Sequence, residues 1–204
     1  MPAPPIPPVR VPFPFPVNLG GTGATTITGL VKAAGTSAFT AATAGTDYCA
    51  PATASTWTNT QTLSGSSSVL ASVMTNIAEI ATVTAGAPAA TVNYYISSQT
   101  VWLYTSNAAN NWVINIAHSA GTTLNTALST GQSVSLVMLV TEGGTAYYNT
   151  SVQVDGTTTG VTTKWQGGIT PASGNINGID VYTYTVIKTA ASTYTVLASQ
   201  TKFA

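Results

Sequence analysis

Residues 181–187 read VYTYTVI, a stretch in which apolar or aromatic side chains alternate with threonine. Such alternation places one set of side chains on each face of a β-strand, so the pattern predicts a half-buried strand. Residues 151–154 read SVQV and repeat the pattern, with two valines set between polar neighbours. Threonine, valine and tyrosine also favour strands. Both stretches therefore indicate an all-β fold for the part of the chain that contains them.

Further runs of strand length lie around these two stretches, separated by sequences typical of turns. The predicted strands are 69–75, 79–84, 91–96, 100–105, 112–117, 132–141, 146–155, 161–165, 179–189 and 193–199. Asp155-Gly156 and Asn177-Gly178 are two of the turn sequences. Residues 123–128 are either a short helical turn or a loop. About ten short strands predict an antiparallel β-sandwich of jelly-roll type over residues 63–204.

Charged residues are unusually rare in this chain. Only 5 Lys+Arg and 5 Asp+Glu occur in 204 residues, and the formal net charge is zero. Nucleic acid is not an expected partner, because proteins that bind it carry a basic patch. Membrane insertion is not expected either, since no apolar run reaches roughly 18 residues. A surface with so little charge does little to keep free monomers apart, so the composition favours a chain that belongs to an assembly.

The first 17 residues are rich in proline. Eight of the eleven prolines lie within residues 2–16. Because proline lacks the amide hydrogen and restricts φ, this segment is expected to be an extended arm. Apolar side chains between the prolines suit docking into a groove on another protein, and a stiff disordered tail is the alternative. The candidate anchoring residues are Ile6, Val9, Val11, Phe13, Phe15 and Val17.

Residues 18–62 are dominated by glycine, alanine and threonine. Large apolar residues are too widely and irregularly spaced here for a helix or strand pattern. A segment of this composition cannot bury a core of its own that offsets the entropy of ordering its backbone. We therefore expect either a neck in which copies of the chain wind around a common axis, or a flexible linker.

Motifs for catalysis or cofactor binding are not found in the sequence, so no cofactor and no enzymatic activity are expected. The glycines near residue 20 neither follow a strand nor open an apolar helix, as phosphate-binding loops do. One cysteine, Cys49, and one histidine, His118, give no metal motif. A hydrolytic site would have to recruit His118 or the acidic residues Glu142, Asp155 and Asp180, for which turn or strand-edge roles are the simpler interpretation.

Aromatic residues are numerous in the predicted strands, where they usually pack in a core or across strand pairs. A platform for stacking sugar rings is the alternative use of such side chains. Tyr147, Tyr148 and Trp165 are near predicted turns and are the candidates for contact with a host surface.

Two parts of the chain resemble structural proteins of tailed bacteriophages. The segment NLGGTGATT at 18–26 is similar to an element common in tail-fibre proteins. Residues 29–51 resemble the sequence that follows this element in those proteins. A second resemblance covers a domain that recurs in cyanophage-like virion proteins. It rests on the stretches TTLNTALSTGQSVSL at 122–136, AYYNTSVQVDG at 146–156, TKWQGG at 163–168, GIDVYTYTVIKT at 178–189 and YTVLASQTKF at 194–203.

The resemblance implies a non-enzymatic, homotrimeric virion protein with three regions. These are an anchoring arm over 1–17, a neck over 18–62 and a head over 63–204. Its implied partners are copies of itself, other virion proteins of the tail, vertex or capsid, and host surface polysaccharide. A short fibre or spike is the first interpretation and a capsid decoration protein the second. A carbohydrate-binding module or a polysaccharide-degrading enzyme remains the alternative from another class.

Overall fold

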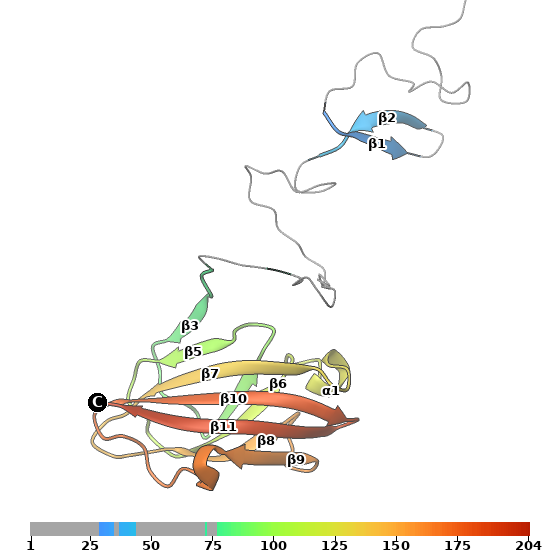
Figure 1. Ribbon diagram of the computed structural model, residues 1–204. Helices are drawn as coiled ribbons and strands as arrows, with labels where there is room; N and C mark the ends of the chain where they lie inside the picture. The colour runs from blue at the N-terminus through green and yellow to red at the C-terminus, as the bar shows by residue number, and fades with distance from the viewer. Residues whose placement is uncertain (1–28, 35–36, 44–71, 73–76) are drawn as a thin grey trace, which may run out of the picture. The chain divides into compact units, whose positions relative to one another are not determined.

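The computed structural model describes residues 29–34, 37–43, 72 and 77–204, and it divides into two units, Met1–Met74 and Thr75–Ala204 (Figure 1). In the first unit, β1 (Val31–Ala34) and β2 (Ser37–Ala41) form an antiparallel hairpin. The amide of Ala42 closes it by donating to the Leu30 carbonyl oxygen at 2.7 Å. The candidate anchoring residues, Cys49 and the predicted strand 69–75, except for residue 72, lie outside the described residues.

The second unit consists almost entirely of strands. They are β3 (Ala81–Thr84), β4 (Thr91–Tyr95), β5 (Val101–Tyr104), β6 (Trp112–Ala117), β7 (Ser133–Thr141), β8 (Asn149–Val154), β9 (Val161–Trp165), β10 (Ile179–Ala190) and β11 (Thr193–Phe203). Two short helical segments, α1 (Leu124–Ala127) and the 3-10 turn η2 (Gln166–Gly168), interrupt them. The β-rich prediction is therefore confirmed, and nine predicted strands have counterparts within a few residues of their expected bounds. Among the described residues, no helix is long and apolar enough to cross a membrane.

These strands form two mixed or parallel sheets. The larger sheet has the order β3-β5-β7-β10-β11-β9, and the smaller has the order β4-β6-β8. From β3 to β8 the chain passes alternately from one sheet to the other, so neighbouring strands of each sheet run parallel. Both antiparallel strand pairs described in this unit involve β10, which lies between β7 and β11. The prediction of an antiparallel sandwich is wrong in this respect, and the jelly-roll connectivity is not confirmed. The turn sequences lead the chain across to the opposite sheet, which alternation within a strand cannot reveal.

One hydrophobic core is supplied by the inward faces of both sheets. Trp112, Ile114 and Ile116 come from β6 of the smaller sheet, and each is fully buried. Tyr182 and Tyr184 come from β10 of the larger sheet. The ring of Trp112 meets that of Tyr182 edge-on, with centroids 5.5 Å apart. The core interpretation of the strand aromatics is thus confirmed for these residues. Figure 1 shows the larger sheet nearer the viewer, with β6 and β8 behind it.

Asp155 closes a turn and also holds α1. Asp155 and Gly156 have φ values of 53° and 82°, as the Asp-Gly turn sequence predicts. The Asp155 carboxylate accepts hydrogen bonds from the amides of Leu124 at 2.6 Å and Asn125 at 3.0 Å. The Lys188 ammonium donates to the carbonyl oxygen of Asn125 within α1 and to that of Leu128, directly after it. Asp155 therefore has a structural role, and the short helical turn is the correct alternative for residues 123–128.

Candidate functional site

The outward face of the larger sheet is apolar on the β3 side. One row of paired residues consists of Val83, Leu103, Leu139 and Val181, one from each of β3, β5, β7 and β10. Their neighbours in sequence, such as Met138 and Tyr182, lie in the core, so this row points away from it. Val83 is 63% exposed. An apolar row is unusual on the solvent side of a sheet.

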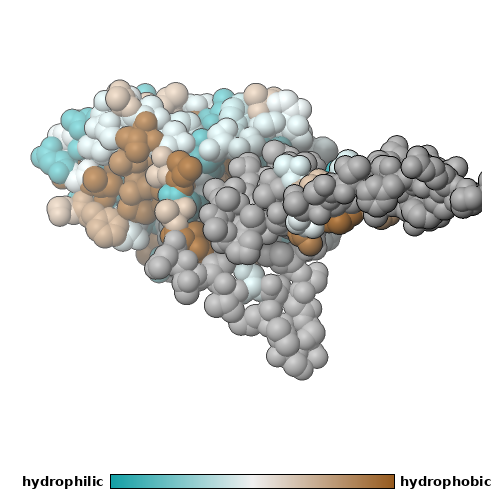
Figure 2. Space-filling view, turned by 90° about the horizontal axis from the view of Figure 1, so that it is seen from above, coloured by the Kyte–Doolittle hydropathy of each residue, from teal (hydrophilic) through white to brown (hydrophobic). Residues whose placement is uncertain are grey.

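A second row extends this surface. Val101 of β5 pairs with Val137 of β7, and both are partly exposed on the same outward face. Ile80, directly before β3, is 89% exposed. Toward β10 and β11 the outward positions become hydroxyl-bearing, with Ser135 and Thr185 hydrogen-bonded at 3.0 Å. We call Val83, Val101, Leu103, Val137, Leu139 and Val181 the outward apolar face. Figure 2 shows hydrophobic residues gathered on one side of the second unit.

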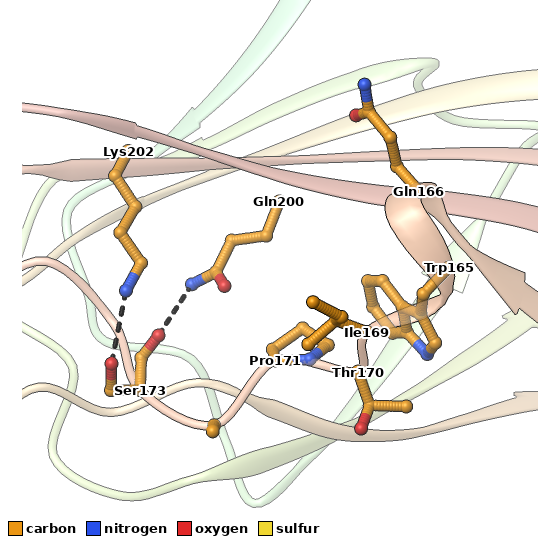
Figure 3. A pocket seen from close by; sticks show the side chains of 9 residues that line it. Trp165, Gln166, Ile169, Thr170, Pro171, Ser173, Gln200 and Lys202 are labelled. Carbon is orange, nitrogen blue, oxygen red and sulfur yellow. Dashed lines mark hydrogen bonds between the residues drawn. The ribbon is translucent and has the colours of Figure 1, made fainter.

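A pocket of about 370 Å³ lies at the end of β9 and β11 (Figure 3). Its apolar wall consists of Trp165, Ile169 and Pro171, and its polar side consists of Ser173, Gln200 and Lys202. Trp165 is partly buried and packs edge-on against the core ring of Tyr184, with centroids 6.2 Å apart. Ile169 is 77% exposed. The pocket thus combines an aromatic wall held by the core with an open apolar rim.

Hydrogen bonds position the polar side of this pocket. The Gln200 amide nitrogen donates to the Ser173 carbonyl oxygen at 3.0 Å, to Asp180 Oδ2 at 2.8 Å and to the Tyr182 hydroxyl at 2.9 Å. The Lys202 ammonium donates to Ser173 Oγ and the Gly174 carbonyl oxygen, each at 3.1 Å. Strand β11 therefore holds the segment around Ser173 with two side chains.

Two buried carboxyl groups lie behind the pocket. Glu142 is 2% exposed and Asp180 is 0% exposed. Both approach Gly174: a Cβ added there would lie 3.0 Å from Asp180 Oδ2 and 3.2 Å from Glu142 Cδ, and would clash with the Tyr147 carbonyl oxygen. Glu142 Oε2 accepts a hydrogen bond from the Tyr147 amide at 3.3 Å. The other oxygen of each carboxyl group, Glu142 Oε1 and Asp180 Oδ1, is buried without a hydrogen-bond partner.

The environment favours the protonated form of these acids. Burial, together with the negative charge of Asp180, raises the pKa of Glu142 from 4.5 to about 7. Burial also raises the pKa of Asp180, although hydrogen bonds from Gln200 and the charge of Lys202 act in the opposite direction. The Glu142 carboxyl group is therefore suited to holding a proton near neutral pH. Both carboxyl groups are closed off from solvent, so they are poorly placed to act on a substrate.

The residues predicted to contact a host surface do not all lie together. Trp165 lines the pocket, whereas Tyr147 and Tyr148 do not. Tyr147 packs against the core, and the amide of Tyr148 donates to Asn111 Oδ1 at 3.0 Å. Sequence reasoning overlooked Ser173, Gln200 and Lys202, and it assigned Glu142 a turn role although its side chain is buried. A surface-contact role for the three aromatic residues stays a prediction.

Metal chemistry is not suggested by the part of the chain that the structure describes, which contains no group of three or more His, Cys, Asp or Glu side chains able to hold an ion. No protein-family model, curated protein or solved structure matches the chain. Function must therefore be argued from the outward apolar face, the pocket and the composition.

Proposed function

We propose that this chain is a non-enzymatic structural protein of a bacteriophage particle, a short trimeric fibre or spike. The observation that carries the proposal is the outward apolar face, which a free monomer would leave in contact with water. Contiguous apolar surface of this kind usually marks a protein interface. A second copy of the chain is the partner that the proposal assigns to it.

Chain order supports this partner. Residues 18–62, the proposed neck, precede β3 by fewer than twenty residues, and β3 is the edge strand of the larger sheet. If three necks wind around a common axis, the three heads are kept at a high local concentration, which favours contact between their β3 edges. Val83, which is exposed on this edge strand, is then available to a counterpart in another copy. The net charge of zero adds no repulsion between the copies.

In this proposal, each region of the chain has its own role. The arm over residues 1–17 anchors the protein to the particle, and the head, which we class as a sandwich of the two sheets, faces outward. Three arms that bind together hold far more tightly than one, because the second and third contacts are intramolecular. A capsid decoration protein is the second candidate, since an anchoring arm joined to a compact head would serve that role equally well.

Deletion of residues 2–17 tests this proposal. The shortened protein should remain a folded trimer and should no longer be incorporated when it is supplied to assembling particles. Normal incorporation would refute the anchoring role. Antibody labelling of particles that carry the full chain distinguishes the two candidates, since a fibre or spike is labelled at the tail or a vertex and a decoration protein over the capsid face. Absence from purified particles would refute both.

A further inference from the structure

We propose that the pocket formed by Trp165, Ile169, Pro171, Ser173, Gln200 and Lys202 binds a sugar unit that carries a carboxylate. The inference rests on the proposed function, in which the head faces the host surface, and it names the chemical class that the head would recognise there. Trp165 would contact the apolar face of the sugar ring, and Lys202 would contact its carboxylate.

The apolar side of the pocket fits a sugar ring. Trp165 offers a large aromatic surface, and its contact with Tyr184 restrains the indole without removing it from the pocket. Ile169 and Pro171 continue the wall beside it (Figure 3). The C–H faces of a pyranose ring suit such a surface, because aromatic side chains bury apolar groups over a wide, rigid area. The volume of about 370 Å³ is at the lower end of the range for small-ligand sites.

The polar side presents both an acceptor and donors. The hydrogen bonds of the Gln200 side chain are all made by its amide nitrogen, whose two hydrogens are shared among three acceptors. Its amide oxygen therefore remains free to accept from a sugar hydroxyl, and Figure 3 shows the nitrogen directed toward Ser173 with the oxygen on the other side. The Ser173 hydroxyl accepts from Lys202 and keeps its own hydrogen to donate.

Charge selects among sugars. Lys202 is the charged side chain among the residues lining the pocket, and its two acceptors, Ser173 Oγ and the Gly174 carbonyl oxygen, are neutral. An ammonium group has three donors, so one remains for a ligand. The nearby carboxylate of Asp180 is buried and receives its hydrogen bond from Gln200. An anionic ligand would therefore meet an ammonium group whose hydrogen-bond acceptors are neutral, and whose charge also acts on the buried Asp180.

Titration of the full chain with methyl β-glucuronide, followed by tryptophan fluorescence, tests the inference, with methyl β-glucoside as the neutral probe. We expect saturable binding of the glucuronide and at least about tenfold weaker binding of the glucoside, the range given by one charge-assisted hydrogen bond. Lys202→Gln should remove this preference. Lys164→Gln is the matched control, because Lys164 is also exposed but lines a separate depression beside Trp165.

Trp165→Ala, measured by isothermal titration calorimetry because the reporting indole is removed, should abolish binding of both sugars. This substitution also removes the core contact with Tyr184. Lys202→Gln is therefore the deciding variant, because Lys202 is exposed. Equal binding of the two sugars, no saturable binding of either, or an equal loss in Lys164→Gln would each overturn the inference. The mass of the same preparation separates this result from the proposed function. A trimer that binds no sugar refutes the pocket, and a monomer that binds the glucuronide refutes the trimeric fibre.

Discussion

Replacement of Glu142 by glutamine should stabilise the protein above neutral pH. The carboxyl group is buried, and Asp180 adds a second negative charge behind the same pocket. The Tyr147 amide donates to Glu142 Oε2, and a glutamine amide oxygen can accept the same hydrogen bond. It also brings amide hydrogens into a site where Asp180 Oδ1 is buried without a partner. The substitution therefore removes a costly charge and keeps the local geometry.

The size of the effect follows from the pKa. Moving the pKa of Glu142 from 4.5 in the unfolded chain to about 7 in the folded protein corresponds to about 3 kcal/mol. Because the folded pKa is raised, the folded state binds the proton more tightly. The wild-type free energy of unfolding should therefore fall as the pH rises from about 4.5 to 7 and level off above that. Glu142→Gln lacks this loss.

Urea denaturation at pH 4.5 and pH 8, at one protein concentration, measures the difference. We expect the variant and the wild type to be similar at pH 4.5, and the variant to be more stable by up to about 3 kcal/mol at pH 8. Glu79→Gln is the control, because it removes one carboxylate at an exposed position. If Glu142→Gln is no more stable than wild type at pH 8, or keeps the same pH dependence, the buried-acid interpretation is wrong.

Three further substitutions address other parts of the structure. Gly174→Ala should destabilise the fold by about 1–3 kcal/mol, because its Cβ would clash with the Tyr147 carbonyl oxygen; unchanged urea denaturation would contradict this packing. Asp155→Ala should cost about 1–2 kcal/mol through loss of its hydrogen bonds from the first amides of α1 and from the Tyr194 hydroxyl, and a cost no larger than that of Glu79→Ala would argue against this structural role. Leu139→Thr with Val181→Thr should leave the fold intact and shift the protein toward monomers in sedimentation, whereas Thr183→Val, on the polar part of the same face, should not. An unchanged trimer in the double variant would show that this face is not the interface.

The strands were predictable because alternation is a local property. The predicted bounds of β6 and β9 match the structure, since their buried and exposed positions alternate within a few residues. Strand orientation was not predictable in the same way. Few residues separate β4 from β5, as in a hairpin, yet β4 pairs with β6 in parallel, because the intervening chain passes through the other sheet. Whether two strands pair in parallel depends on which sheet the next strand joins. A stretch of a few residues does not contain this information.

Part of the candidate site could have been predicted from the alternation of residues along β10 and β11. Gln200 and Lys202 continue the inward set of β11 that begins at Tyr194, and Asp180 continues the inward set of β10. A polar residue at an inward position near a strand end indicates either a buried network or a pocket. Ser173 left no such signal, because the loop that carries it is brought to β11 by tertiary hydrogen bonds. Trp165 was found because an aromatic residue beside a turn is a familiar binding feature.

Sedimentation equilibrium of the full chain is the most direct measurement of the central claim that copies of this protein associate through the neck and the outward apolar face. We expect a mass of three times 20.7 kDa that persists on dilution. A stable species of 20.7 kDa at working concentrations would contradict the trimeric fibre and leave the outward apolar face without its proposed partner.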